Sequence, residues 1–138
     1  MQVTERERDA LYSFVRTMAP WELFFTGTFS KPCGLFEAGK IFEAFMDREV
    51  PRVSYFYAVE KNPGGLGHHI HGLLYGTKDL RRCVVWKKWF DRYGRNRLEP
   101  IRNHKSVTDY STKYVIKEGA LWWYRLNDPV LANMQKED

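Results

Sequence analysis

The chain alternates between stretches with helical hydrophobic spacing and stretches typical of strands. Thr4 and Glu7 form a capping box, Thr-x-x-Glu, which opens the first helical stretch. Helices are predicted at residues 5–18, 36–48, 79–93 and 106–117. Strands are predicted at residues 21–29, 53–61, 68–75, 97–102 and 121–126.

The order of these elements predicts the fold. Asn62-Pro63-Gly64-Gly65 is a turn sequence, so the strands on either side of it should pair as a hairpin. From residue 21 to residue 102 the order is β-α-β-β-α-β, which is the ferredoxin-like arrangement. We therefore expect an α+β fold with an antiparallel sheet of about five strands and helices packed on it, an N-terminal helix, and a C-terminal helix and strand. No repeat or linker divides residues 1–138, which suit a single domain.

Composition narrows the class of protein. Apolar residues make up 43% of the chain and charged residues 28%, which argues against a disordered tail. No run approaches the roughly 18 uninterrupted apolar residues of a membrane-spanning helix. The first residues alternate charges of both signs, so no export signal is expected. Cys33 and Cys83 lie far apart without a Cys-x-x-Cys pair, which fits the reducing cytosol.

The net charge of +5 is concentrated in one segment. Residues 78–105 contain ten basic and three acidic side chains, a local charge of +7. Four aromatic residues lie among these cations, a combination that suits a polyanion with stackable bases. They are Trp86, Trp89, Phe90 and Tyr93. Their helical spacing favours the plainer interpretation that most of them belong to the core, while the cationic face points outward. The expected DNA contacts on that face are Lys87, Lys88, Arg92, Arg81 and Arg82.

A pair of histidines in the second hairpin strand predicts a metal site. His69 and His71 should project from the same face of that strand, with Ile70 turned into the core. Glu60 lies near the end of the partner strand, where pairing would bring its carboxylate to the imidazoles. Two nitrogen ligands and one oxygen ligand leave coordination positions of a divalent ion open for water or phosphate, which suits an ion that acts as a Lewis acid. A structural zinc ion, by contrast, usually has four protein ligands. A His-x-His pair alone also occurs by chance on surfaces.

A second group of residues lies in the last predicted helix. Tyr110 and Tyr114 are four residues apart, and Lys113 and Lys117 repeat that spacing. Such tyrosines often serve only to pack an amphipathic helix. A phenol titrates near pH 10 and becomes a useful nucleophile at neutral pH only when nearby cations stabilise the phenolate, which the lysines and a metal-bound phosphate would do.

Three segments together resemble the HUH endonucleases, the rolling-circle replication initiators. His69-Ile70-His71 is similar to their histidine-hydrophobic-histidine motif, and residues 110–117 are similar to their Tyr-x-x-Lys motif. Residues 24–29, Phe-Phe-Thr-Gly-Thr-Phe, resemble the third motif of the family. Because the tyrosines follow the histidines, the resemblance favours the replication initiators over the relaxases. The transposase branch shares this order and stays as an alternative, although the doubled Tyr-x-x-Lys pattern counts against it.

The resemblance implies an activity and roles for these residues. Such enzymes nick single-stranded DNA at a replication origin, leaving a 5′ phosphotyrosyl link and a free 3′ hydroxyl. Glu60, His69 and His71 would bind Mg or Mn, which polarises the scissile phosphate. Tyr114 is the first choice of nucleophile because it fits both the single-tyrosine and the paired-tyrosine form of the family. In the catalytic set it is joined by Tyr110, Lys113 and Lys117.

The resemblance also implies partners and a setting. The chain has no GxxxxGK[ST] motif, so a host helicase, supercoiling or a cruciform is expected to open the duplex, and a host polymerase to extend the 3′ end. The expected home is a plasmid or virus in the cytoplasm of a bacterial or archaeal host.

Two other functions fit the same residues. One is a non-catalytic module that binds single-stranded nucleic acid with Trp21, Phe24, Phe25 and the basic helix as a stacking platform. The other is a metal-dependent phosphodiesterase in which water attacks the phosphate.

Overall fold

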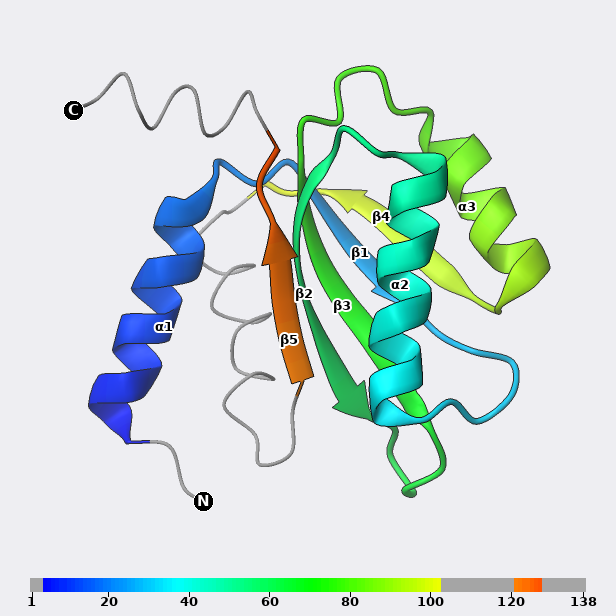
Figure 1. Cartoon of the computed structure of the whole chain (residues 1–138), viewed down its shortest axis with the longest axis horizontal. Coiled ribbons are helices and arrows are strands. Elements are labelled where there is room, and N and C mark those ends of the chain that lie inside the picture. Colours follow the sequence, from blue (N-terminus) through cyan, green and yellow to red (C-terminus); the bar gives the residue numbers. More distant parts are fainter. Residues whose placement is uncertain (1–3, 103–120, 128–138) are drawn as a thin grey trace.

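The computed structural model of the protein describes residues 4–102 and 121–127. The elements in this part of the chain alternate as the sequence predicts, with helices and strands in β-α-β-β-α-β order between an initial helix and a final strand (Figure 1). They are α1 (Glu5–Met18), β1 (Leu23–Gly27), α2 (Leu35–Glu49), β2 (Ser54–Lys61), β3 (His68–Tyr75), α3 (Arg82–Arg92), β4 (Asn96–Pro100) and β5 (Leu121–Arg125).

The described strands form one antiparallel sheet in the order β4-β1-β3-β2-β5. Its first four strands have the ferredoxin-like order, which confirms the predicted α+β class. The 53–61 and 68–75 segments pair as a hairpin, and β5 extends the sheet beyond β2. The two hairpin strands are therefore flanked on both sides, so the side chains at the sheet centre are held by paired backbones.

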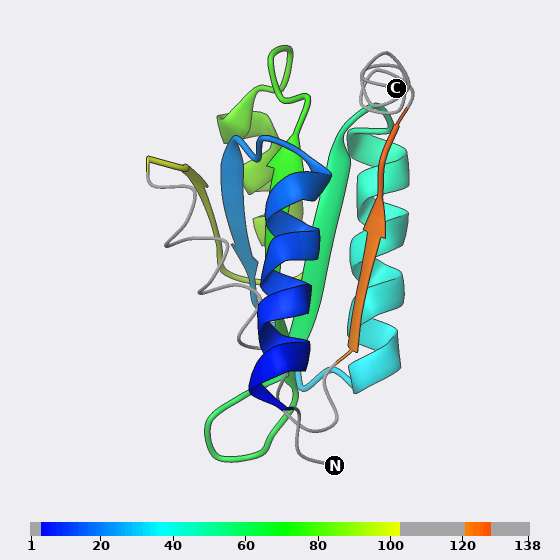
Figure 2. The same cartoon turned by 90° about the vertical axis from the view of Figure 1, so that its left-hand side faces the viewer.

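The two faces of the sheet are covered by different helices. Phe42 of α2 packs against Phe25 of β1, in the core that α2 and α3 close. Val15 of α1 belongs to a second core with Phe56 and Leu73, on the opposite face. Strand β2 passes between α1 and α2 in the turned view (Figure 2). Because side chains alternate between the two faces along each strand, neighbouring residues of a strand contact different helices.

Several element boundaries differ from the prediction. Strand β1 is shorter than residues 21–29, and α3 begins at Arg82 instead of residue 79. The amide of Leu80 donates to the carbonyl of Thr77 in a turn, and Arg81 is extended, so the helix cannot start earlier. The helix predicted at residues 106–117 lies outside the described residues. Among the described helices, none combines the length and the apolar content that a membrane crossing requires.

Candidate metal centre

The hairpin brings the three predicted ligands together on one face of the sheet. Glu60 of β2 is the Cα partner of His69 on β3. His71 lies two residues further along β3 and therefore on the same face of the sheet. Ile70 between the histidines is fully buried in the core on the other face, as the strand alternation predicts. The predicted His, His and Glu set is thus confirmed as a group that could hold a metal ion.

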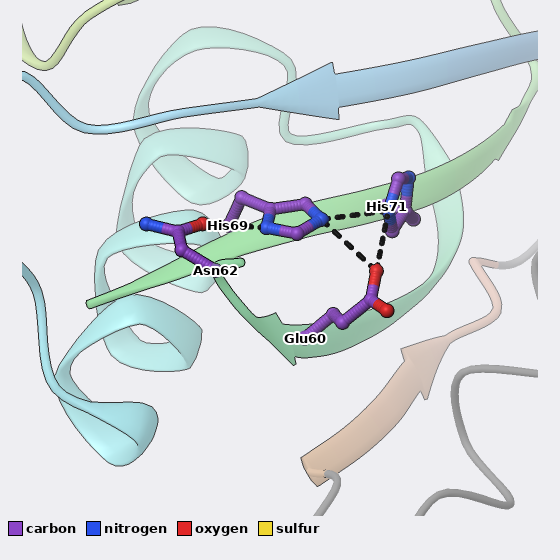
Figure 3. Close-up of polar contacts among 4 residues, drawn as sticks. All are labelled: Glu60, Asn62, His69 and His71. Atoms are coloured by element: carbon purple, nitrogen blue, oxygen red, sulfur yellow. Dashed lines mark hydrogen bonds and ion pairs between the residues drawn. The ribbon is translucent and has the colours of Figure 1, made fainter. Parts of the chain in front are cut away.

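The three ligand atoms form a compact triangle (Figure 3). His69 Nε2 lies 3.0 Å from Glu60 Oε2 and 3.0 Å from His71 Nε2, and His71 Nε2 lies 3.3 Å from Glu60 Oε2. Adjacent ligands around an ion with bonds of about 2.1 Å are about 3.0 Å apart in an octahedron and about 3.4 Å apart in a tetrahedron. The triangle therefore fits one face of an octahedral or tetrahedral site, with the remaining positions open to other ligands.

Asn62 fixes the orientation of one imidazole. His69 Nδ1 lies 2.7 Å from Asn62 Oδ1, an acceptor, so Nδ1 carries the proton and the Nε2 lone pair points at the other two ligands. Metal-binding histidines commonly hold their second nitrogen in this way. This role is not predicted from the sequence, because Asn-Pro-Gly-Gly indicates only a turn and Asn62 contacts His69 through the fold of the hairpin.

The hairpin loop places Asn62 through its own backbone. The Asn62 amide donates to the carbonyl of Gly67, and its side-chain amide donates to the carbonyl of Leu66. Gly67 has a φ of 77°, and a Cβ built on it would lie 2.9 Å from the Cα of Pro32. Only glycine suits both this backbone conformation and this close approach. The turn sequence therefore contributes to the site as well as to the fold.

The site is largely enclosed, and an aromatic ring stacks on one of its imidazoles. The side chains of Glu60 and His69 are 15% and 14% exposed, and that of His71 is 7% exposed. The ring of Phe24 on β1 is stacked on His71 with an angle of 15° between the planes. Phe24 belongs to the segment that resembles the third family motif, and this stacking gives the segment a structural role beside the candidate ligands.

Tyrosines of the neighbouring strand are poor nucleophiles. Tyr55 and Tyr57 of β2 are buried on the face opposite the triad. Burial raises the pKa of Tyr55 to about 12, and it raises the pKa of Tyr57 still further above the usual value. The predicted nucleophiles Tyr114 and Tyr110, with Lys117 and Lys113, lie outside the described residues.

The basic helix α3 packs on the face opposite the triad. Its buried residues Val85 and Trp89 join the core that α2 covers. Lys87 Nζ lies 3.0 Å from Asp91 Oδ2, and Lys88 Nζ lies 2.6 Å from Glu49 Oε2. Lys88 lowers the pKa of Glu49 through this hydrogen bond.

The remaining predicted DNA contacts lie at the ends of the same helix. Arg81 is the N-cap of α3, Arg82 is its first residue, and Arg92 is its last. DNA binding by these cations stays a prediction.

Two predictions about aromatic residues are wrong in part. Of the four on the basic helix, Trp89 and Tyr93 pack in the core as predicted. Trp86 and Phe90 are 42% and 47% exposed, because α3 sits over the edge of the sheet. Trp21 and Phe25, offered as a stacking platform, are 1% and 2% exposed and belong to the two cores. Any stacking of bases on this protein must therefore use other rings.

Comparison with known proteins adds no family assignment. The sequence matches no protein-family model, and neither the curated proteins nor the solved structures include a significant match. The geometry of the triad and the sequence motifs are therefore the features that indicate its function.

Proposed function

We propose that this protein is a metal-dependent enzyme that nicks and rejoins single-stranded DNA through a tyrosine nucleophile, as the HUH replication initiators do. The observation that carries the proposal is the convergence of Glu60, His69 and His71 within 3.0 to 3.3 Å on adjacent strands. Support also comes from the sequence, because the aromatic segment, the histidine motif and the Tyr-x-x-Lys motifs follow one another along the chain in the family's order.

The triad suits a divalent ion with open coordination positions. Glu60, His69 and His71 would hold Mg or Mn, and the bound ion supplies positive charge to a phosphate oxygen at the scissile bond. Asn62 keeps His69 in the tautomer that can bind. The two imidazoles make the site more favourable for Mn than for Mg, since Mg prefers oxygen ligands.

The proposed reaction exchanges one phosphodiester for another. The phenolic oxygen of Tyr114 attacks the phosphorus and loses its proton, while Lys117 stabilises the developing phenolate. The bond from phosphorus to the 3′ oxygen breaks, and that oxygen takes up a proton to become the free 3′ hydroxyl. The DNA 5′ end stays linked to Tyr114 until a 3′ hydroxyl attacks and rejoins the strand.

The test is detection of the covalent intermediate. The protein is incubated with a pool of single-stranded oligonucleotides and Mn, then analysed on a denaturing gel and by mass spectrometry. We expect an adduct that disappears with excess chelator, in the His69→Ala/His71→Ala variant and in Tyr114→Phe. His68→Ala is the matched control, because His68 precedes His69 on β3 but contacts the carbonyl of Cys33 instead of the triad.

The other outcomes distinguish the alternatives. An adduct in excess chelator, or in the double histidine variant, would refute the metal mechanism. Metal-dependent cleavage without an adduct would indicate water attack by a phosphodiesterase, and binding without cleavage would indicate the non-catalytic module. If Tyr110→Phe loses the adduct while Tyr114→Phe keeps it, Tyr110 with Lys113 is the working pair.

A further inference from the structure

A pocket of about 470 Å³ opens at the edge of the sheet and is lined by residues of α3, β4 and β1. Figure 1 shows α3 beside β4 at this edge. One wall is aromatic. Trp86 and Phe90 stack with ring centroids 5.0 Å apart and 12° between their planes, and both are about half exposed. The indole Nε1 of Trp86 donates to the carbonyl of Asn96, which fixes the wall to β4. A rigid, exposed aromatic surface of this kind suits the face of a flat ring.

A buried amide in the pocket lining has an unused acceptor. Asn96 is 7% exposed, and its Nδ2 donates to the carbonyl of Trp86, which orients the side chain. Its Oδ1 is buried and accepts no hydrogen bond from any group in the described part of the chain. A buried acceptor without a donor is costly, so this atom points to a ligand that brings an N–H group.

Two arginines, one directly before β4 and one within it, line the pocket. They are Arg95 and Arg97, and both are exposed. Arg97 has an exposed carboxylate partner, Glu99, at 3.8 Å, a distance at which such pairs contribute little. A second hollow of about 350 Å³ shares Arg95 and Phe90 with the pocket and reaches Arg92. The ligand should therefore be anionic as well as flat, and longer than one ring.

The sheet register connects this pocket to the triad. Thr26 lines the pocket and is the Cα partner of Arg97 on one side and of His71 on the other. Directly opposed residues share a face, so Arg97, Thr26 and His71 form one row across the sheet. With strands about 4.8 Å apart, Arg97 and His71 are about 10 Å apart along this row, which one or two nucleotides can span.

We propose that the pocket holds one unpaired nucleotide of single-stranded DNA, next to the phosphate at the triad. The base stacks on Trp86 and Phe90, an amino group of the base donates to Asn96 Oδ1, and the flanking phosphates bind Arg95 and Arg97. The assignment of the neighbouring phosphate rests on the proposed function. Adenine and cytosine carry an exocyclic amino group, whereas thymine offers only its ring N3–H, which lies between two carbonyl oxygens that find no donor on Asn96, because its Nδ2 already donates to Trp86. The pocket should therefore favour adenine and cytosine over thymine.

Binding of labelled oligonucleotides in excess chelator tests the pocket apart from the chemistry. By fluorescence anisotropy, dA12 and dC12 should bind more tightly than dT12. Phe90→Ala should weaken binding of dA12 by about 5- to 150-fold, the loss of one base stack. Phe36→Ala is the matched control, because Phe36 is 68% exposed on α2, away from the pocket. The proposal would be overturned if Phe90→Ala and Phe36→Ala bound dA12 equally tightly, or if the wild type bound dA12 and dT12 equally tightly.

Two further measurements keep the proposal testable if Phe90→Ala folds poorly. Arg95→Gln and Arg97→Gln should each lower the salt dependence of binding by about 0.7 in log-log slope, and Lys40→Gln on α2 should not. In protein labelled with 5-fluorotryptophan, the ¹⁹F signal of Trp86, assigned with Trp86→Phe, should shift on adding dA12, and that of Trp123 on β5 should not. A stationary Trp86 signal in saturated protein would refute the pocket.

The pocket and the catalytic proposal can fail independently. His69→Ala/His71→Ala should bind dA12 normally in chelator while forming no adduct. If Phe90→Ala binds normally and the wild type still cleaves, the pocket is wrong and the proposed function stands. If no cleavage occurs but Phe90→Ala loses binding, the pocket stands and the proposed function is wrong.

Discussion

The role of Asn62 gives the most direct test of how the site is built. Asn62→Ala removes the acceptor that holds His69 Nδ1 at 2.7 Å and leaves the ligand atoms themselves intact. A neutral hydrogen bond contributes about 1 kcal/mol. Freeing the imidazole to rotate costs a further 0.5 to 1 kcal/mol or so in side-chain entropy on binding. The sum is about 2 kcal/mol, which corresponds to a loss of about 30-fold in metal affinity and falls within the range for such partners of ligands.

The measurement is a calorimetric titration with Mn at fixed pH. Lys61→Ala is the control, since Lys61 is exposed on the same hairpin and its side chain is not part of the triad. Asn62→Asp keeps an acceptor for His69 and should restore most of the affinity, although it loses the hydrogen bond to the carbonyl of Leu66. This rescue separates an effect on His69 from general damage to the turn.

Equal metal affinity in the two variants would refute this role of Asn62. If Asn62→Ala binds Mn as tightly as Lys61→Ala does, the hydrogen bond does not prepare His69 for a metal. The close triangle would then be explained by hydrogen bonds alone, with a proton shared between the imidazoles and Glu60. Circular dichroism of both variants establishes that the comparison is made between folded proteins.

Two further predictions concern stability. Gly67→Ala places a Cβ at a φ of 77° and 2.9 Å from the Cα of Pro32, so it should lower the free energy of unfolding by about 2 kcal/mol or more, measured in urea; a change below about 0.5 kcal/mol would contradict the close packing. The hydrogen bond from Lys88 lowers the pKa of Glu49 below its ordinary value of 4.5. The interaction between Lys88 and Glu49 therefore stabilises the fold above pH 4.5, and this stabilisation is lost as the pH falls through the lowered pKa of Glu49. Glu49→Gln should therefore be less stable than the wild type at pH 7, with a difference that narrows in acid; a pH-independent difference would exclude this ion pair as its source.

The sequence allowed the hairpin and its ligands to be predicted because local chemistry determines both. The Asn-Pro-Gly-Gly turn sets where the strands reverse, and strand alternation then puts His69 and His71 on one face. Once the turn is placed, Glu60 falls opposite His69 without any information about the rest of the fold. The same register places Asn62 at the end of the hairpin, beside the histidine strand. Its place in the turn is therefore predictable from the sequence, whereas its hydrogen bond to His69 is not.

The exposed aromatic residues could not be predicted in this way. Trp86, Trp89 and Phe90 have the spacing of one helix face, and periodicity alone assigns all of them to a core. Trp89 is fully buried, but α3 lies over an edge strand, so the sheet beneath it is too narrow to cover Trp86 and Phe90. Burial of a helix face depends on what lies opposite, which only the tertiary arrangement provides.

The face of the sheet under α1 changes from apolar to polar along both hairpin strands, one pair of residues earlier on β3 than on β2, where buried Ala58 pairs with His71. Leu73 of β3 and Phe56 of β2 are buried in the core that α1 closes, and His71 and Glu60 follow further along the same face. Residues 5–10 of α1 are exposed, so the beginning of that helix does not bury itself against the sheet. The apolar side chains that α1 must cover lie mainly at one end of this face. The other end can therefore carry the triad, Thr26 and Arg97 without weakening the core. The ligands are thus supported by paired strands at the sheet centre, beyond the part of this face that the described residues of α1 cover.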